Sequence, residues 1–399
     1  MAHVVVIGAG QAGSSVVAKL RNDGFEGEVT LIGAEPILPY QRPPLSKKYL
    51  LGEMDLERLF LRPKAFYDDN NITLKLGKAV DSVDSIGKTI AIGGEKIGYD
   101  QLVFATGSSP RYLPASVGGD LGGVYAVRDL ADVDAMASEF ESDRHVLVIG
   151  GGYIGLEAAA VAASKGLRVS VVEMADRILQ RVACKETSDF FRRLHQENGV
   201  EIIEGVGLET LIGDGRVRQA KLSDGRILNV DFVVAGIGIM PCALVAEMAG
   251  VAMDNGIATD KFGRTNVDGI WAAGDCASFP YNGQRIRLES VPNAIDQAET
   301  VAQNIMGGEK EYNAKPWFWS DQYDVKLQIA GLNSGYDDVI ARRGEGAVSF
   351  WYFKGDAMLA VDAMNDPRGY MIGKRIIEAG KTIDKTAVAD PATDLRAFM

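Results

Sequence analysis

Two glycine-rich segments have the spacing that brings a protein backbone close to phosphate groups. They contain Gly8, Gly10 and Gly13 in the first segment and Gly150, Gly152 and Gly155 in the second. In such a segment the first glycine permits a tight turn, the second lets a pyrophosphate approach the backbone, and the third lets a helix pack on a strand. The N–H groups at the start of that helix then face the phosphates. The chain therefore carries two candidate dinucleotide sites.

A carboxylate follows each glycine segment at the distance expected of a ribose-binding residue. Glu35 lies 22 residues after the last glycine of the first segment, and Glu173 lies 18 residues after that of the second. A carboxylate at this place accepts hydrogen bonds from ribose hydroxyls and repels a 2′-phosphate. The second site is therefore expected to favour NADH over NADPH. Arg177 and Arg181 follow closely in the sequence and leave recruitment of a phosphate as the alternative.

Apolar segments on both sides of the glycines are expected to form the strands and helices that position them. The expected strand, helix and strand are 4–7, about 12–20 and 29–32 in the first copy, and 146–149, about 154–165 and 169–172 in the second. A glycine turn inside a complete βαβ unit is far more specific than glycine spacing alone. The predicted fold class is therefore α/β, with two Rossmann-like dinucleotide-binding domains.

Length and composition are typical of a globular enzyme. The chain has 399 residues, of which 47% are apolar and 24% charged, enough for two or three domains. A net charge of −12 makes nucleic acids and anionic membranes unfavourable partners. No run approaches the roughly 18 apolar residues of a membrane span, and the first strand begins too near Met1 for a signal peptide. We expect a cytoplasmic protein that binds neither nucleic acid nor membrane.

The cysteines argue against a metal site, a structural disulfide and electron transfer to a disulfide substrate. Cys184, Cys242 and Cys276 are odd in number, far apart, and without zinc-ligand spacing. We therefore expect no metal site and no structural disulfide. No cysteine precedes Cys184, so the first βαβ unit is not followed by a cysteine pair that passes electrons to a disulfide substrate.

Seven segments together resemble the FAD-dependent, NADH-oxidising ferredoxin reductases of bacterial monooxygenase and dioxygenase systems. They are Gly8 to Gly13, Arg42-Pro-Pro-Leu-Ser-Lys47, Ala105-Thr-Gly107, Gly150 to Glu157, Gly274-Asp275-Cys276, Glu289-Ser-Val-Pro-Asn293 and Pro316-Trp-Phe-Trp-Ser-Asp-Gln322. The resemblance extends over nearly the whole chain. It implies a glutathione-reductase-like fold with a C-terminal α+β domain. The implied boundaries are 1–112 and 243–314 for a split FAD-binding domain, 113–242 for an NAD-binding domain, and 315–399 for the C-terminal domain.

The resemblance also assigns site residues. Those implied to bind FAD are Gly8, Gly10, Gly13, Glu35, Arg42, Lys47, Val80, Thr106, Gly107, Arg128, Gly274, Asp275 and Val291. Those implied to bind NADH are Gly150, Gly152, Tyr153, Ile154, Gly155, Glu157 and Glu173. Lys47 and Glu157 are implied to form an ion pair beside the isoalloxazine that orients the nicotinamide, since a buried lysine needs an anionic partner. Trp319 is implied to cover the flavin on the side of a one-electron acceptor.

The implied activity is transfer of a hydride from NADH to FAD, followed by release of single electrons to a [2Fe-2S] ferredoxin. That ferredoxin would serve a cytochrome P450 or a dioxygenase, and the reductase is expected to be a monomer or weak dimer. An acidic ferredoxin needs a basic docking patch. Candidate contributors are Arg62, Lys64, Arg285, Arg287, Arg342, Arg343, Lys374 and Arg375. The alternatives are an NADH oxidase or peroxidase, and an NADH-sensing flavoprotein resembling apoptosis-inducing factor.

Overall fold

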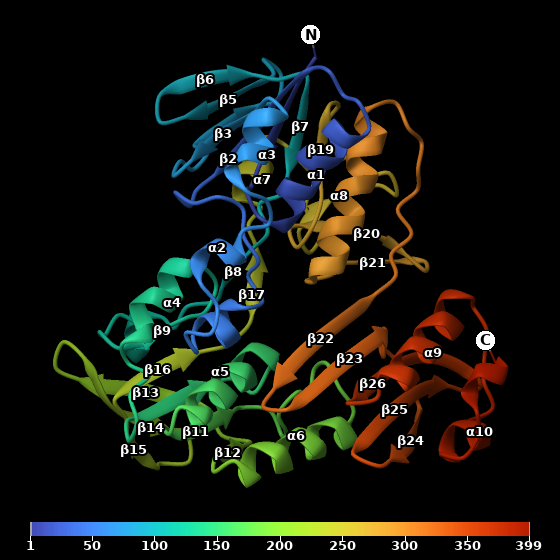
Figure 1. Ribbon diagram of the computed structural model, residues 1–399. Coiled ribbons are helices and arrows are strands. Elements are labelled where there is room, and N and C mark those ends of the chain that lie inside the picture. Colours follow the sequence, from blue (N-terminus) through green and yellow to red (C-terminus); the bar gives the residue numbers. More distant parts are fainter. Residues whose placement is uncertain (1, 399) are drawn as a thin grey trace. The chain divides into compact units, whose positions relative to one another are not determined.

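The computed structural model describes residues 2–398 and contains two compact units, each assembled from three separate stretches of the chain (Figure 1). The first unit consists of Met1–Gln41, Leu56–Ser109 and Ile239–Pro316. The second consists of Arg42–Asp55, Pro110–Gly238 and Trp317–Met399. The boundaries of the three domains expected from the sequence stay predictions.

The first unit is built on a five-stranded parallel sheet in the order β19, β7, β1, β2, β3. These strands are Ile270–Ala272, Gln101–Phe104, His3–Ile7, Glu28–Gly33 and Ile72–Leu76. Helices α1 (Gln11–Asn22) and α8 (Val291–Ile305) pack together against the face that carries Val4 and Val6 (Figure 1). Val5, on the opposite face, packs with Val83 and Ile90 of a small antiparallel sheet. Apolar residues therefore run continuously along β1, as expected of a parallel strand buried on both faces.

Shorter elements complete the first unit. They are α2 (Leu56–Leu59), α3 (Lys64–Asp69), β4 (Ser82–Asp84), β5 (Thr89–Ile92), β6 (Glu95–Gly98), β8 (Ser108–Pro110), β17 (Ile239–Pro241), α7 (Leu244–Met248), β18 (Ile257–Ala258), β20 (Ala277–Tyr281) and β21 (Gln284–Ile286). The small sheet consists of β4, β5 and β6, which are antiparallel.

The second unit begins with a parallel sheet of the same kind, in the order β12, β11, β10, β16, β9. These strands are Glu201–Glu204, Arg168–Glu173, His145–Ile149, Phe232–Ala235 and Val124–Tyr125. Around it are η1 (Leu45–Tyr49), η2 (Ala115–Val117), α4 (Leu130–Ala137), α5 (Tyr153–Ser164), α6 (Lys185–Glu197), β13 (Leu208–Gly213), β14 (Val217–Leu222) and β15 (Ile227–Asn229). Residues of β13 and β14 bury one face of β10. Two parallel sheets with their helices confirm the predicted α/β fold.

The second unit ends with an antiparallel sheet in the order β22, β23, β26, β25, β24. Its strands are Trp317–Gln322, Val325–Gly331, Ala357–Met364, Ala347–Lys354 and Asp338–Gly344, and α9 (Pro367–Glu378), α10 (Lys385–Ala389) and η3 (Leu395–Phe398) come after them. Helix α9 packs on this sheet over Trp351 and Val361. Strands and helices are thus combined at the C-terminus as predicted. No helix within residues 2–398 has the length and apolar character needed to cross a membrane.

A buried polar cluster joins the antiparallel sheet to α6. Asp362 of β26 is 1% exposed and accepts hydrogen bonds from the hydroxyls of Tyr352 and, at 2.7 Å, Thr187. The Tyr352 oxygen accepts in turn from the backbone N–H of Cys184, the N-cap of α6, at 2.9 Å. Burial raises the pKa of Asp362 to about 6, despite these hydrogen bonds.

Replacing Asp362 with asparagine should flatten the pH dependence of stability. Because the carboxyl has a pKa of about 6 when folded and an ordinary value of 3.8, the folded state binds this proton more tightly. Stability from this group is therefore full below pH 4 and is lost as pH rises through 6, by on the order of 3 kcal/mol. The free energy of unfolding, measured with urea at several pH values between 4 and 7, should change less with pH in the D362N variant than in the wild type. An unchanged slope would contradict the assignment, and D268N, at a fully exposed aspartate, is the matched control.

Candidate functional site

The first glycine segment forms the turn between β1 and α1. Gly8 has φ +114°, and a Cβ added there would lie 2.1 Å from the carbonyl oxygen of Ala105. A Cβ on Gly13 would lie 1.9 Å from the carbonyl oxygen of Gly8. A Cβ on Gly10, the N-cap of α1, would have no described atom within 4 Å. Close packing therefore requires glycine at positions 8 and 13, whereas Gly10 leaves the helix N-terminus open to an anion.

The second segment repeats this geometry between β10 and α5. Gly150 has φ +102°, and its added Cβ would lie 2.4 Å from the carbonyl oxygen of Gly236. A Cβ on Gly155 would lie 2.2 Å from the carbonyl oxygen of Gly150, whereas one on Gly152, the N-cap of α5, meets no described atom within 4 Å. Both turns thus offer backbone N–H groups at an open helix N-terminus and fit the pyrophosphates of two dinucleotides.

Glu173 is held directly against the second turn. Its carboxylate accepts hydrogen bonds from the backbone N–H groups of Gly151, at 2.7 Å, and Ala175, at 2.8 Å. A carboxylate has acceptor positions to spare for ribose hydroxyls. Arg177 points its guanidinium into the protein instead, where it donates to the carbonyl of Ala183 at 2.8 Å and to the hydroxyl of Ser188. This arrangement favours an unphosphorylated ribose. In the first unit, Glu35 accepts a hydrogen bond from the Tyr40 hydroxyl at 2.5 Å.

The other residues expected at the first site gather at the carboxyl edge of the sheet in the first unit. A Cβ on Gly274, just after β19, would lie 2.9 Å from the Cβ of Ala12 in α1, so the two turns are neighbours. Asp275 accepts from the Ser108 hydroxyl at 2.9 Å, and the Thr106 hydroxyl donates to the carbonyl of Cys242 at 2.5 Å. Ligands of open α/β sheets bind at this edge.

Three more expected residues lie in the same unit. Gly107 accepts a backbone hydrogen bond from Cys242 at 3.0 Å. Val80 is partly buried against the apolar cluster under the sheet. Val291 is the first residue of α8, whose N-cap Ser290 accepts from the backbone N–H of Asn293 at 3.4 Å.

Lys47 and Glu157 form a buried ion pair within the second unit. Lys47 lies in η1 and Glu157 in α5, and the Nζ and Oε1 atoms are 2.9 Å apart with side chains 15% and 7% exposed. The hydroxyl of Ser46 donates to Oε2 at 3.2 Å and that of Ser320 to Oε1 at 2.7 Å. Burial raises the pKa of Glu157, and the Lys47 ammonium and these hydroxyls oppose the rise. The carboxylate is thus surrounded by one cation and two donors.

The remaining residues expected at the sites also lie in the second unit. The Arg42 guanidinium donates to the carbonyl of Arg128 at 2.8 Å. Ile154 is 42% exposed at the start of α5. The neighbouring Tyr153 packs its ring 5.1 Å from that of Phe318, and its buried hydroxyl has no hydrogen-bond partner in the described part of the chain.

Successive side chains of β22 point to opposite faces of its sheet. Trp317 and Trp319 share one face, with ring centroids 5.5 Å apart. Phe318, Ser320 and Gln322 occupy the other, and the two polar residues there are fully buried. Trp319 therefore lies on the face opposite the side chain that holds Glu157.

Sequence reasoning missed Ser46, Ser320, Gln322 and His195, which surround or support Glu157. Both serines lie inside motifs that were recognised, and the period of two along β22 was the signal that pairs Ser320 with Gln322. His195 is fully buried in α6 and donates or accepts through both ring nitrogens. Nothing local to its sequence indicates this, since its partners lie more than 120 residues away.

Several basic residues considered for docking are already occupied. Arg342 donates to five backbone carbonyls between residues 387 and 393, and Arg285 donates to the carbonyls of Thr259 and Ser278. Lys64 pairs with Asp68 at 2.7 Å. The ion pair offsets the charge of Lys64, and the backbone contacts hold the guanidinium groups of Arg342 and Arg285 in place. Residues 2–398 contain no group of three or more histidine, cysteine, aspartate or glutamate residues placed to hold a metal ion.

Comparisons with known proteins give one consistent result. Residues 2–298 match the family model described as pyridine nucleotide-disulphide oxidoreductase, and residues 317–399 match the reductase C-terminal model. The chain is 44% identical to a ferredoxin--NAD(P)(+) reductase of Sphingomonas sp. over 99% of its length and 97% of that protein. It is 37% identical to putidaredoxin reductase of Pseudomonas putida over 100% and 96%. The reductase in a covalent putidaredoxin reductase–putidaredoxin complex superposes with a TM-score of 0.96 at 36% identity, covering 100% and 98% of the two chains.

Two alanine substitutions in the second turn should separate binding from folding. The G152A variant should keep the wild-type melting temperature, because its Cβ meets no described atom, yet raise the KM for NADH about tenfold by intruding where a pyrophosphate approaches. The G155A variant should melt several degrees lower, because its Cβ overlaps the Gly150 carbonyl. Calorimetry and initial rates check both. Equal melting temperatures for the two variants, or an unchanged KM in G152A, would contradict this reading of the turn.

Proposed function

The chain belongs to the pyridine nucleotide-disulphide oxidoreductase family, and from that premise we propose that it is an FAD-dependent NADH:ferredoxin reductase. It oxidises NADH and delivers electrons one at a time to a [2Fe-2S] ferredoxin that supplies a cytochrome P450 or a ring-hydroxylating oxygenase. The observation that carries the proposal is likeness to ferredoxin reductases along the whole chain, together with two intact dinucleotide turns. A monomer or weak dimer in the cytoplasm, as expected from the sequence, remains part of the proposal.

FAD, when bound, supplies the chemistry of accepting a hydride and releasing single electrons. In this chain the first glycine turn, Asp275 and the N-terminus of α8 would hold that cofactor. The second glycine turn would hold the pyrophosphate of NADH, and Glu173 its adenosine ribose. Helix N-termini stabilise negative charge, so both turns favour the anionic dinucleotides over neutral ligands.

Lys47 and Glu157 orient the nicotinamide in this proposal. The pair is almost fully buried, and removing either partner leaves an uncompensated charge, which is strongly destabilising. Each charge therefore fixes the position of the other, and a rigid pair can hold a substrate ring at the geometry needed for hydride transfer. Neither group has to gain or lose a proton. Trp319, on the outer face of β22, is proposed to lie toward the electron acceptor.

Two of the three cysteines, Cys184 and Cys276, are unsuited to the thiolate chemistry of the oxidase and peroxidase alternative. Cys276 is fully buried and its thiol donates to the carbonyls of Ala273 and Phe104 at 3.4 and 3.5 Å. Burial raises the pKa of Cys276 and also that of Cys184, so both stay thiols at neutral pH. Peroxide reduction through cysteine requires a reactive thiolate.

The decisive experiment on function is NADH-driven reduction of cytochrome c with and without a purified [2Fe-2S] ferredoxin. The proposal predicts a rate at least tenfold higher with the ferredoxin, because the cytochrome then receives its electrons through the cluster. Ferredoxin-independent turnover with rapid consumption of oxygen would instead identify an oxidase. Stable NADH-reduced flavin with slow turnover toward every ferredoxin tried would favour the NADH-sensing alternative.

Replacing Glu173 with arginine should narrow the preference for NADH over NADPH. The carboxylate repels a 2′-phosphate, and a guanidinium would attract it. We expect the ratio of kcat/KM for NADH to that for NADPH to exceed ten in the wild type and to fall at least tenfold in the variant. The R181Q variant tests the alternative that this arginine recruits a phosphate, and it should leave the ratio unchanged. An E173R protein that retains the wild-type ratio would mean that the ribose is held by other residues.

A further inference from the structure

A row of buried hydrogen bonds leads from Glu157 to a histidine in another helix. The Ser320 hydroxyl lies 2.7 Å from Glu157 Oε1, and Gln322 Nε2 lies 3.2 Å from Ser320 Oγ. His195 Nε2 lies 2.8 Å from Gln322 Oε1, and the Tyr323 hydroxyl lies 3.1 Å from His195 Nδ1. Ser320, Gln322 and His195 are all fully buried. The row therefore has no contact with water until Tyr323.

Donor and acceptor capacities give this row one direction. A carboxylate only accepts, so the single Ser320 proton points to Glu157, and the serine oxygen accepts from the amide of Gln322. The Gln322 oxygen then accepts from His195 Nε2–H, which leaves Nδ1 to accept from the Tyr323 hydroxyl. Turning the Gln322 amide around would take the Ser320 proton away from Glu157. Burial lowers the pKa of His195 to about 4, so the ring is neutral at pH 7, as this direction requires.

We propose that Ser320, Gln322 and His195 are positioning residues that hold the Glu157 carboxylate ionised and in one orientation for its partner Lys47. Every donor in the row points toward the carboxylate, and aligned hydrogen bonds in a buried site strengthen one another. The part concerning hydride transfer rests on the proposed function. The part concerning the carboxylate itself does not.

Substitutions at His195 test the proposal. H195Q keeps a donor toward Gln322 and should reduce flavin at a rate within twofold of wild type, whereas H195L removes the donor and should slow the limiting rate at saturating NADH three- to tenfold. The apparent Kd for NADH and the reoxidation of reduced flavin by ferredoxin should stay unchanged in both. H3Q, which alters a histidine of the other unit, is the control. Stopped-flow absorbance gives all three quantities, and calorimetry gives each melting temperature.

Wild-type flavin reduction in a folded H195L protein would overturn the proposal, as would equal slowing in H195L and H195Q. If H195L does not fold, S320A removes the last donor and should slow the same step. Infrared titration of the buried carboxyl band supplies a readout besides activity, because the Glu157 pKa should rise in S320A relative to wild type. A shifted titration without a slower hydride transfer would refute the role of Glu157 in the reaction. An unshifted titration would refute the row itself.

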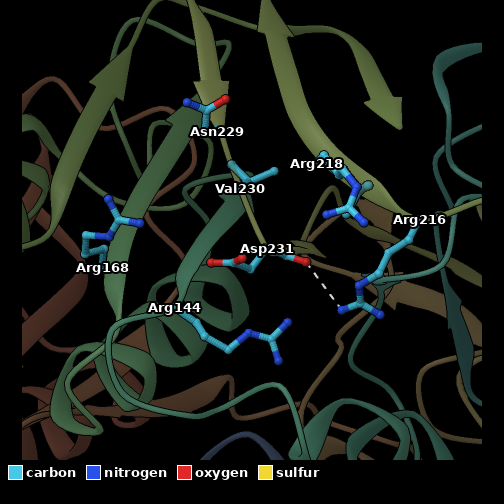
Figure 2. A pocket seen from close by; sticks show the side chains of 8 residues that line it. Arg144, Arg168, Arg216, Arg218, Asn229, Val230 and Asp231 are labelled. Atoms are coloured by element: carbon cyan, nitrogen blue, oxygen red, sulfur yellow. Dashed lines mark hydrogen bonds between the residues drawn. The ribbon is translucent and has the colours of Figure 1, made fainter. Parts of the chain in front are cut away.

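A separate observation carries a second inference. Arginine side chains surround a hollow of about 330 Å³ in the second unit (Figure 2). Its lining includes Arg144, Arg168, Arg216, Arg218 and Asp231. Arg144 and Asp231 immediately precede β10 and β16, and Arg168 is the first residue of β11. Since these parallel strands carry the glycine turn at their opposite ends, the hollow is distinct from the second dinucleotide turn.

The charges around the hollow do not balance. Glu139 pairs with Arg144 at 2.5 Å and Arg216 at 2.6 Å. The Asp231 carboxylate already accepts the backbone N–H of His145 at 2.7 Å, and its carbonyl accepts from Arg216 at 3.3 Å. Within the part of the chain described, the side chains of Arg168 and Arg218 form no hydrogen bond or ion pair. Two guanidinium groups thus remain available in a protein whose net charge is −12.

We infer that this hollow binds a small phosphate-bearing anion. Its volume is at the lower end of the range for small-molecule sites, and the guanidinium fork matches phosphate oxygens in pairs. Arg168 and Arg218 would supply the uncompensated charge.

Calorimetric titration with inorganic pyrophosphate tests this inference on the FAD-loaded protein. Saturating NAD⁺ is added to block the second glycine turn, and ionic strength is held constant with sodium chloride. We expect a Kd below 1 mM that weakens at least tenfold in the R168Q/R218Q double variant and is unchanged in R193Q, at an exposed arginine of the same unit, with the KM for NADH the same in all. No binding to the wild type, or the same Kd in the double variant and the control variant, would overturn the inference.

Discussion

The buried contact between Lys47 and Glu157 is an electrostatic constraint on the second unit. An ion leaves water at a cost of several kcal/mol, which is recovered only with a partner and hydrogen bonds in good geometry. Here that requirement draws η1, α5 and β22 to one carboxylate, because Ser46 and Ser320 donate to the same group. Three segments that are far apart in the sequence are therefore held to the same charged group. In the proposed reaction this rigidity becomes the means of orienting a nicotinamide.

The two glycine turns of this chain have the same backbone geometry. In both turns the first glycine has a positive φ, and a Cβ added at the first or third glycine would lie less than 3 Å from a backbone carbonyl oxygen, whereas one at the second glycine would meet no described atom within 4 Å. The carboxylates that come after the two turns make different contacts. Glu173 is tied to the backbone of its own turn, whereas Glu35 bonds to the Tyr40 hydroxyl. In the proposed function the turns would hold phosphates alike, and the neighbouring side chains would distinguish the ligands.

Local chemistry made much of the fold readable from the sequence. The first helix was expected at about 12–20 and spans Gln11–Asn22, and the second was expected at about 154–165 and spans Tyr153–Ser164, because glycine turns and apolar periods are local signals. The residues around Glu157 were only partly readable. Whether Ser320 or Trp319 faces α5 depends on the register of β22, and His195 joins through a tertiary contact. The hydrogen bonds from Arg342 to backbone carbonyls also depend on residues far away in the sequence.

A double-mutant cycle at Lys47 and Glu157 tests the account most directly. The reductive half-reaction with NADH is followed by stopped flow in the wild type, K47M, E157Q and the double variant. Coupled residues should give an interaction free energy of roughly 0.5 to 3 kcal/mol, so that the double variant loses clearly less than the sum of the single losses. Reoxidation of the reduced flavin by ferredoxin should change far less. Additive losses, or single variants that reduce flavin at the wild-type rate, would contradict the claim that this ion pair orients the nicotinamide.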